Sequence, residues 1–217
     1  MSEVVVSGYG IVSSLGIGVQ ANESMLLKGQ TGLKNAVELD SNYSSKLKFG
    51  EVPFSLPQLR DKIKLSFDKN SCHRTNALAI LAVEEAVEMS GLSLQELKNA
   101  AFISASTVGG MCQDKELYYI VSGGEDTSQI HVDSFSSGAC TEFVAKKFGF
   151  NGFINTINTA CSSSANSIAM GYQMINPMGR PYKSTDSDIE ASISRVMTNL
   201  VSQEQVEFAR YFKSMYS

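Results

Sequence analysis

Apolar residues fall into runs along the chain that predict alternating strands and helices. The β-branched run Val4 to Val6 precedes Gly8 and Gly10, a pattern that predicts a buried strand breaking into a tight turn. The stretch HRTNALAILAVEEAVEMSG is apolar over most of its surface and predicts a buried helix that ends at Gly91. Residues Ala101 to Thr107 then predict a strand. This order of elements indicates an α/β fold with helices packed on a sheet.

The same alternation continues further along the chain. The stretch HVDSFSSGACTEFVAKKFGFNG predicts a helix and a turn, and Phe153 to Thr159 alternate as a strand does. SSSANSIAMGYQMI predicts a second helix. Its period places four residues on one face: Ala165, Ile168, Ala169 and Tyr172.

Residues 177–217 differ in character from what precedes them, so we expect two units, 1–176 and 177–217. Two prolines and a glycine predict a linker at the junction, and two capping boxes, Ser187 with Glu190 and Ser202 with Gln205, each predict a short helix. The two helices would carry apolar stripes made of Ile189, Ile193, Val196 and Leu200, and of Val206, Ala209, Phe212 and Tyr216.

Composition and charge exclude several classes of protein. The chain has 217 residues and a net charge of -4, which gives no reason to expect a nucleic-acid partner. Its first residues lack the features of a signal peptide, and no apolar run is long enough to span a membrane. We therefore expect a cytosolic protein with no membrane partner.

The cysteine and glycine spacings predict no metal and no cofactor. No C-x-x-C pair and no histidine at zinc-ligand spacing accompanies the four cysteines, so neither a metal site nor a disulfide framework is indicated. The first glycines depart from the G-x-G-x-x-G spacing of dinucleotide-binding turns. The cysteines are Cys72, Cys112, Cys140 and Cys161.

Cys161 alone lies at a predicted strand-to-helix turn. Unpaired N–H groups and the positive end of the helix dipole favour a thiolate there, and the thiolate is the nucleophilic form. A buried and inert cysteine remains the alternative, since most free cysteines behave as small apolar residues.

Four stretches together resemble the N-terminal half of β-ketoacyl-acyl carrier protein synthases of the elongating type, members of the thiolase superfamily. The resemblance covers residues 3–175, and its most specific part is T-A-C-S-S-S after an F-G-x-x-G turn. It implies half of a thiolase-like fold, a mixed sheet with packed helices, followed here by a helical C-terminal tail. The stretches are VVVSGYGIVSSLG, RTNALAILAVEEAVEMSGL, STVGG and KKFGFNGFINTINTACSSSANSIAMGYQMI.

The resemblance places Cys161 on the family's active-site cysteine, which a chain-length-factor relative would be expected to lack. It implies an acyltransferase of fatty-acid or polyketide synthesis that holds the acyl group as a thioester on Cys161. A malonyl unit on the carrier protein would then be decarboxylated and attack that thioester. The backbone N–H of Cys161 is placed to supply half of an oxyanion hole.

The chain departs from the family after Ile175. The family's two histidines and a lysine that support decarboxylation follow the cysteine, whereas His73 and His131 both precede Cys161. We therefore expect a truncated chain that does not complete condensation alone. The tail would cap a half-domain, bind a partner, or come from a foreign reading frame or a neighbouring gene, and the abrupt departure favours this last origin.

Partners follow from the same resemblance. Five basic residues form the densest basic cluster before Cys161, and we expect either a docking patch for an acyl carrier protein or an ordinary solvated face. A homodimer through the strand before Cys161, or a ketosynthase-like partner subunit, is also expected. The five residues are Arg60, Lys62, Lys64, Lys69 and Arg74.

Two other functions stay open. One is a non-catalytic interaction subunit built from half a ketosynthase. The other is a cysteine hydrolase that pairs Cys161 with His131, for which the sequence suggests no residue to orient the histidine.

Overall fold

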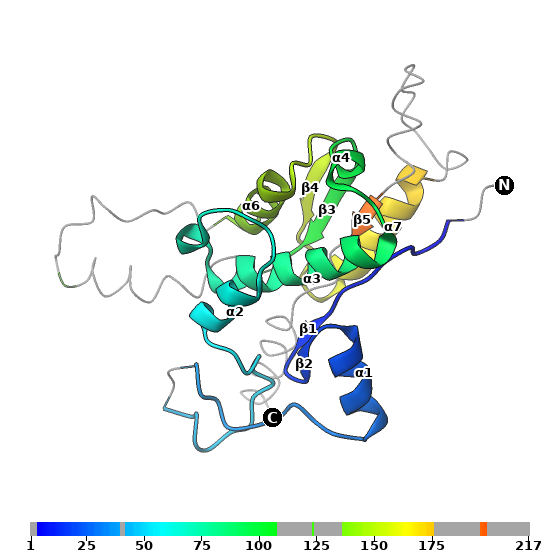
Figure 1. The fold of residues 1–217 in the computed structure, drawn as a ribbon. Coiled ribbons are helices and arrows are strands. Elements are labelled where there is room, and N and C mark those ends of the chain that lie inside the picture. Colours follow the sequence, from blue (N-terminus) through cyan, green and yellow to red (C-terminus); the bar gives the residue numbers. More distant parts are fainter. Residues whose placement is uncertain (1–3, 40–41, 108–122, 124–135, 176–195, 199–217) are drawn as a thin grey trace.

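Strand β3 (Ala101–Ala105) lies at the centre of a parallel sheet, between β4 (Ile154–Ile157) and β5 (Val196–Thr198) (Figure 1). The computed structural model of the chain describes residues 4–39, 42–107, 123, 136–175 and 196–198. Ala105 of β3 pairs with Ile157 of β4, so the carboxyl ends of the two strands lie side by side. Every residue of β3 is buried, as in a strand covered on both faces.

One face of the sheet is covered by α3 (Arg74–Ser90) and α6 (Ala139–Phe148). Phe102 points into this layer, where it is fully buried and stacks on Phe150 with 4.8 Å between ring centroids. The helix predicted from the central apolar stretch is confirmed as α3. It ends at Gly91, whose positive φ of 68° is the conformation that glycine accepts most easily.

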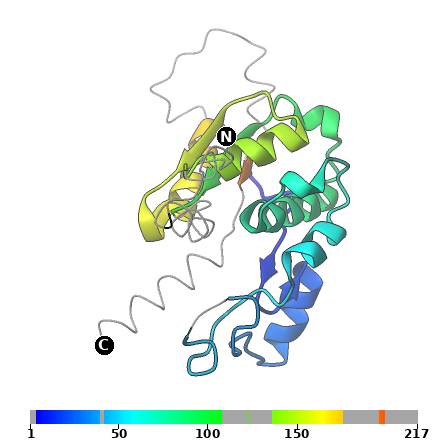
Figure 2. The same ribbon diagram turned by 90° about the vertical axis from the view of Figure 1, so that its left-hand side faces the viewer.

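Helix α7 (Ser163–Ile175) packs against β3, β4 and β5 on the side of the sheet away from α6 (Figures 1 and 2). The four residues predicted to share one face do so, and they are exposed, with Ile168 at 44% and Tyr172 at 51%. Small residues let the helix backbone approach the sheet closely. The buried face consists of Ser163, Ser167 and Gly171.

The predicted N-terminal strand is wrong. Val5 and Val6 are 70% and 82% exposed, and the segment belongs to no strand. The chain instead crosses α3 in close contact: a Cβ on Gly8 or Gly10 would lie 2.3 or 2.0 Å from a carbonyl oxygen of that helix. The two glycines therefore serve a close backbone approach to a helix, and without a neighbouring strand the valines have no ladder to join.

A small unit follows this crossing. Strands β1 (Val12–Ser13) and β2 (Gly16–Ile17) pair antiparallel and lead into α1 (Val19–Leu27), which lies apart from the parallel sheet in Figure 1. The Glu85 carboxylate of α3 accepts hydrogen bonds from the N–H groups of Ile11 and Val19 at 3.0 and 2.7 Å. It thereby fixes this unit to the rest of the fold.

The remaining elements lie around the ends of α3. Helix α2 (Leu56–Lys62) packs on α3, the short turn η1 spans Lys69–Ser71, and α4 (Leu94–Leu97) precedes β3. The resulting arrangement of helices on a sheet agrees with the predicted α/β class.

One prediction for the tail is wrong. Val196 was expected on a helical stripe, but it lies in β5, where Val196 to Thr198 pair with Ala101 to Ile103. The free edge of β3 offers hydrogen-bonding groups that need partners, and this pairing outweighs the local helical pattern. Both predicted capping boxes lie outside the described residues.

Candidate active site

Cys161 lies on the turn that joins β4 to α7, as the sequence predicts. Strand β4 ends at Ile157, a 3-10 turn η4 spans Ala160–Ser162, and α7 begins at Ser163. The side chain of Cys161 is exposed, and the first turn of α7 contains no acidic residue. The thiol therefore faces solvent beside the N–H groups of a helix start, which carry partial positive charge.

Ala160, directly before the cysteine, has a strained backbone. Its φ is 53°, and within the described part of the chain it is the only non-glycine residue with a positive φ. An alanine pays an energetic cost in this region, so the conformation persists only where neighbouring contacts hold it.

Ser163 supplies two of these contacts from a fully buried position. Its hydroxyl donates to the carbonyl oxygen of Ala160 at 2.7 Å and accepts from the N–H of Thr159 at 2.9 Å. The N–H of Ser163 donates to the same carbonyl oxygen. The first residue of α7 thus holds the peptide group that follows Ala160 and the one that precedes Thr159.

Thr107 supplies a contact that the sequence analysis missed. Its Oγ1 donates to the Ala160 carbonyl oxygen at 3.2 Å, from a position two residues beyond the end of β3. The signal that could have found it is topological, because parallel strands that are neighbours bring their carboxyl ends to the same edge of a sheet.

The backbone N–H groups of Cys161 and Ser162 differ in their hydrogen bonding. Within the described residues the N–H of Cys161 donates to no acceptor, whereas the next N–H, of Ser162, donates to the Thr159 carbonyl oxygen at 3.3 Å. An N–H group without an acceptor among the described residues, beside an exposed thiol, is the arrangement needed to stabilise negative charge on a reacting carbonyl oxygen.

A polar network borders the cysteine on the solvent side. Asn166 donates from Nδ2 to Thr159 Oγ1 at 2.8 Å and to Ser162 Oγ at 3.3 Å. The Ser162 hydroxyl donates to the Thr159 carbonyl oxygen at 2.9 Å. These bonds order the residues on both sides of Cys161 without using its own side chain.

The other described cysteines have different environments. Cys72 is completely buried, and burial raises the pKa of its thiol to about 11 although the charges of Arg60 and Lys147 oppose the rise. Cys140 is half-buried in the first turn of α6. Among the described cysteines, Cys161 is the exposed one, and Cys112 lies outside the described residues.

Two of the five basic residues predicted to dock a carrier protein hold the fold locally. Arg74 donates to the carbonyl oxygens of Phe54 and Val52 at 2.6 and 2.8 Å. Arg60 donates from Nε to the carbonyl oxygen of Cys72 at 2.9 Å. These guanidinium groups bind backbone near α2 and α3, and docking stays a prediction.

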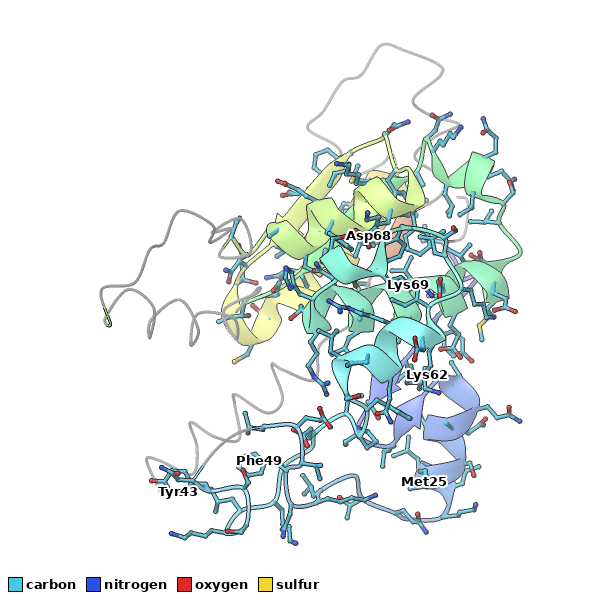
Figure 3. The ribbon with its side chains drawn as sticks, turned by 60° about the vertical axis from the view of Figure 1, so that its left-hand side comes forward. Met25, Tyr43, Phe49, Lys62, Asp68 and Lys69 are labelled. Atoms are coloured by element: carbon cyan, nitrogen blue, oxygen red, sulfur yellow. The ribbon has the colours of Figure 1, made fainter. Side chains whose placement is uncertain are left out.

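The three lysines of the cluster make contacts of three different kinds. Lys69 donates to the carbonyl oxygen of Ile63 at 2.7 Å, and Lys64 forms an exposed ion pair with Glu88 at 2.6 Å. The Nζ of Lys62 lies 4.9 Å from the ring centroid of Phe54. Figure 3 shows Lys62 and Lys69 on the same side of the molecule, along α2 and η1.

The structure brings no histidine into hydrogen-bond contact with Cys161 within the residues it describes. His73 caps the N-terminus of α3, where burial and then the charge of Arg60 lower its pKa. His131 lies outside the described residues. In the described ranges, no cluster of His, Cys, Asp and Glu could hold a metal ion, and no helix is long and apolar enough to cross a membrane.

Comparisons with known proteins agree on one family. The family described as beta-ketoacyl synthase, N-terminal domain, matches residues 1–178. A Streptomyces cyaneus protein with the provisional name polyketide beta-ketoacyl synthase 1 is 26% identical over 190 residues, covering 79% of this chain and 42% of that protein. The chain thus spans less than half the length of this relative.

Solved structures show the same fold. A beta-ketoacyl synthase from Burkholderia phymatum STM815 superposes with a TM-score of 0.64 at 17% identity, over 89% of this chain and 50% of that one. A type II polyketide synthase ketosynthase, solved in complex with its acyl carrier protein, gives a TM-score of 0.58 at 22% identity, over 80% of this chain and 42% of that one.

Proposed function

Because residues 1–178 match the N-terminal domain of beta-ketoacyl synthases, the chain belongs to that family of condensing enzymes, and we propose that Cys161 accepts an acyl group from an acyl carrier protein. The observation that carries the proposal is the exposed thiol of Cys161 on a strained turn, next to its own N–H, which has no acceptor among the described residues. The solved complex of a related ketosynthase with its carrier protein supports the choice of donor.

The proposed step is a thioester exchange. The Cys161 sulfur attacks the carbonyl carbon of the carrier-bound thioester, and a tetrahedral oxyanion forms opposite the Cys161 N–H. The bond from that carbon to the carrier sulfur then breaks, and the carrier thiolate leaves with the electron pair. The proton of the cysteine passes through water to the leaving thiolate, so that a thioester on Cys161 and a free carrier thiol remain.

We propose further that this chain does not complete condensation alone. Decarboxylation of a malonyl thioester requires donors that stabilise charge on its carbonyl oxygen, and removing one such donor typically costs about a hundred- to a thousandfold in rate. The family resemblance implies histidines for this role after the cysteine, but both histidines of the sequence precede it. Steady formation of β-ketoacyl product by the purified chain, lost in Cys161→Ala, would contradict the proposal.

The acyl-transfer step can be tested by intact-mass measurement. The purified chain is incubated with an acyl carrier protein charged with a saturated acyl group, and the expected result is a mass gain equal to that group. Cys161→Ala should show no gain, while the matched control Cys140→Ala should behave as the wild type. An unchanged wild-type mass with carrier protein still bound would favour the non-catalytic interaction subunit.

Docking of the carrier protein is proposed along α2 and η1. Arg60 and Arg74 bind backbone carbonyl groups, so Lys62 and Lys64 are the residues whose charge can be reversed with least effect on the fold. The double variant Lys62→Glu/Lys64→Glu should bind the carrier more slowly and with a flatter dependence on salt. A Lys28→Glu control tests charge reversal at the C-cap of α1. If the double variant binds the carrier at low salt with the on-rate of the wild type, Lys62 and Lys64 do not form the docking patch.

A homodimer through β4 is also proposed. In the described part of the sheet, β4 is an edge strand. Its first residue, Ile154, is 40% exposed, and Phe153, which precedes the strand, is 44% exposed. Exposed β-branched edges readily pair with a second copy. Sedimentation should show a dimer that Ile154→Lys weakens, and a stable wild-type monomer would contradict this assembly.

A further inference from the structure

Thr107 links two parts of the chain that are far apart in sequence. Strand β3 ends at Ala105, which pairs with Ile157 at the end of β4. The residues that follow the two strands therefore meet at one edge of the sheet, and Thr107 Oγ1 donates to the Ala160 carbonyl oxygen at 3.2 Å across a separation of 53 residues.

The Ala160 carbonyl group and the Cys161 N–H belong to one peptide unit. This unit is planar and trans, since the described chain contains no cis peptide bond, so its C=O and N–H point in opposite directions. Whatever holds the carbonyl oxygen therefore also sets the direction of the N–H.

The donors to the Ala160 carbonyl oxygen come from different parts of the fold. The two donors of Ser163 tie the oxygen to the start of α7, and they move with that helix. Thr107 ties the same oxygen to the end of β3, a buried strand that pairs with β4 as far as Ala105. Thr107 is thus the contact that fixes the peptide relative to the sheet.

We infer that Thr107 is a positioning residue for acyl transfer, whose hydroxyl holds the Ala160–Cys161 peptide so that the Cys161 N–H faces the oxygen of the acyl carbonyl group. The inference rests on the proposed function, in which Cys161 is the acyl acceptor. Thr107 touches no reacting atom and acts through the peptide alone.

If Thr107 has this role, its loss should affect two reactions of the Cys161 thiol differently. Acetylation by p-nitrophenyl acetate forms a bond from Sγ to the ester carbonyl carbon, breaks the carbon–oxygen bond to p-nitrophenolate and passes through an oxyanion that the Cys161 N–H can stabilise. Alkylation by iodoacetamide forms a bond from Sγ to the methylene carbon and releases iodide without any oxyanion. In both reactions the thiol proton goes to solvent. A misdirected N–H should therefore slow acetylation and spare alkylation.

The test uses the full chain as wild type, Thr107→Val and Thr107→Ser. Valine has the shape of threonine without the donor, and serine keeps the hydroxyl. Both reactions are followed by mass spectrometry on the tryptic peptide from Phe148 to Lys183, in which Cys161 is the only cysteine. We expect acetylation of Thr107→Val to fall about tenfold, less than the loss of a whole oxyanion donor, with alkylation within about twofold of wild type. Thr107→Ser should restore acetylation.

Three results would overturn the inference. These are equal loss of both reactions in Thr107→Val, no loss of either, and failure of Thr107→Ser to restore acetylation. Thermal unfolding of each variant is measured in parallel, and Thr107→Ala replaces the valine variant if that one does not fold. A wild-type chain that is acetylated by p-nitrophenyl acetate but takes no acyl group from the carrier thioester would refute the proposed function. The acetylation and alkylation rates of the Thr107 variants would still decide whether Thr107 positions the Cys161 N–H. A wild-type chain that is alkylated but not acetylated would refute both.

Discussion

Alkylation of Cys72 should be at least about a hundredfold slower in the native chain than in the denatured chain at about pH 8. Cys72 lies next to the start of α3 and is completely buried, while its carbonyl oxygen is held by Arg60. Burial raises the pKa of the thiol from 9.0 to about 11, and the nearby charges of Arg60 and Lys147 only partly oppose that rise.

The magnitude follows from the fraction of thiolate. At about pH 8, a thiol with a pKa of 9.0 is about one-tenth ionised, whereas a thiol with a pKa of about 11 is about one-thousandth ionised. The ratio is about a hundredfold. Because the reagent must also reach a side chain with no exposed surface, the measured ratio should be this large or larger.

The assay compares each cysteine with itself. The chain is treated with iodoacetamide in buffer and in concentrated guanidinium chloride, and the tryptic peptide from Asn70 to Arg74 reports Cys72 alone. Cys161, on its own peptide, is exposed and should show no such protection in the native chain. Native and denatured rates for Cys72 within about tenfold of each other would show that its burial does not control its ionisation.

Three further predictions concern stability. Gly10→Ala should lower the free energy of unfolding by about 1–3 kcal/mol in urea titrations, because its Cβ would meet an α3 carbonyl oxygen at 2.0 Å; an unchanged midpoint would mean that the segment lifts away freely. His73 has a pKa lowered by burial and by Arg60, so the folded chain binds fewer protons there than the unfolded chain, and stability should fall as the pH drops below 6.5. His73→Gln should flatten this decline, and an identical pH profile would exclude His73 as its source. Ser163→Ala removes a buried hydroxyl that bonds to Thr159 and Ala160, so it should cost about 1–3 kcal/mol, and urea denaturation showing less than about 0.5 kcal/mol would contradict the role given to it.

Local patterns predicted the elements that local forces determine. Helix α3 has an apolar surface and a glycine stop, so its length and its end at Gly91 follow from sequence. The run Val4 to Val6 has the β-branched composition of a strand, but a strand forms only beside a neighbouring strand, which the local pattern cannot reveal. Val196 shows the converse error, because its place in β5 is set by an edge of β3 about 95 residues earlier.

The candidate site was predicted in part. The position of Cys161 between β4 and α7 followed from periodicity, and the structure confirms it. The contact from Thr107 could not be predicted from spacing, because it depends on which two strands are neighbours. The bonds from Arg74 to backbone carbonyl oxygens could not be predicted from the sequence either. A cluster of basic residues has the same sequence pattern whether its side chains face solvent or bind backbone.

The order of strands has a consequence for synthesis on the ribosome. Strand β3 pairs with β4 about 50 residues later and with β5 about 95 residues later, so the central strand is made well before either neighbour. At about 5–20 residues per second, its second edge waits roughly 5–20 s for the segment that fills it. During that interval an apolar strand with an open edge is exposed to other nascent chains. Slower growth at low temperature, or a chaperone that binds extended apolar segments, should therefore raise the yield of native protein.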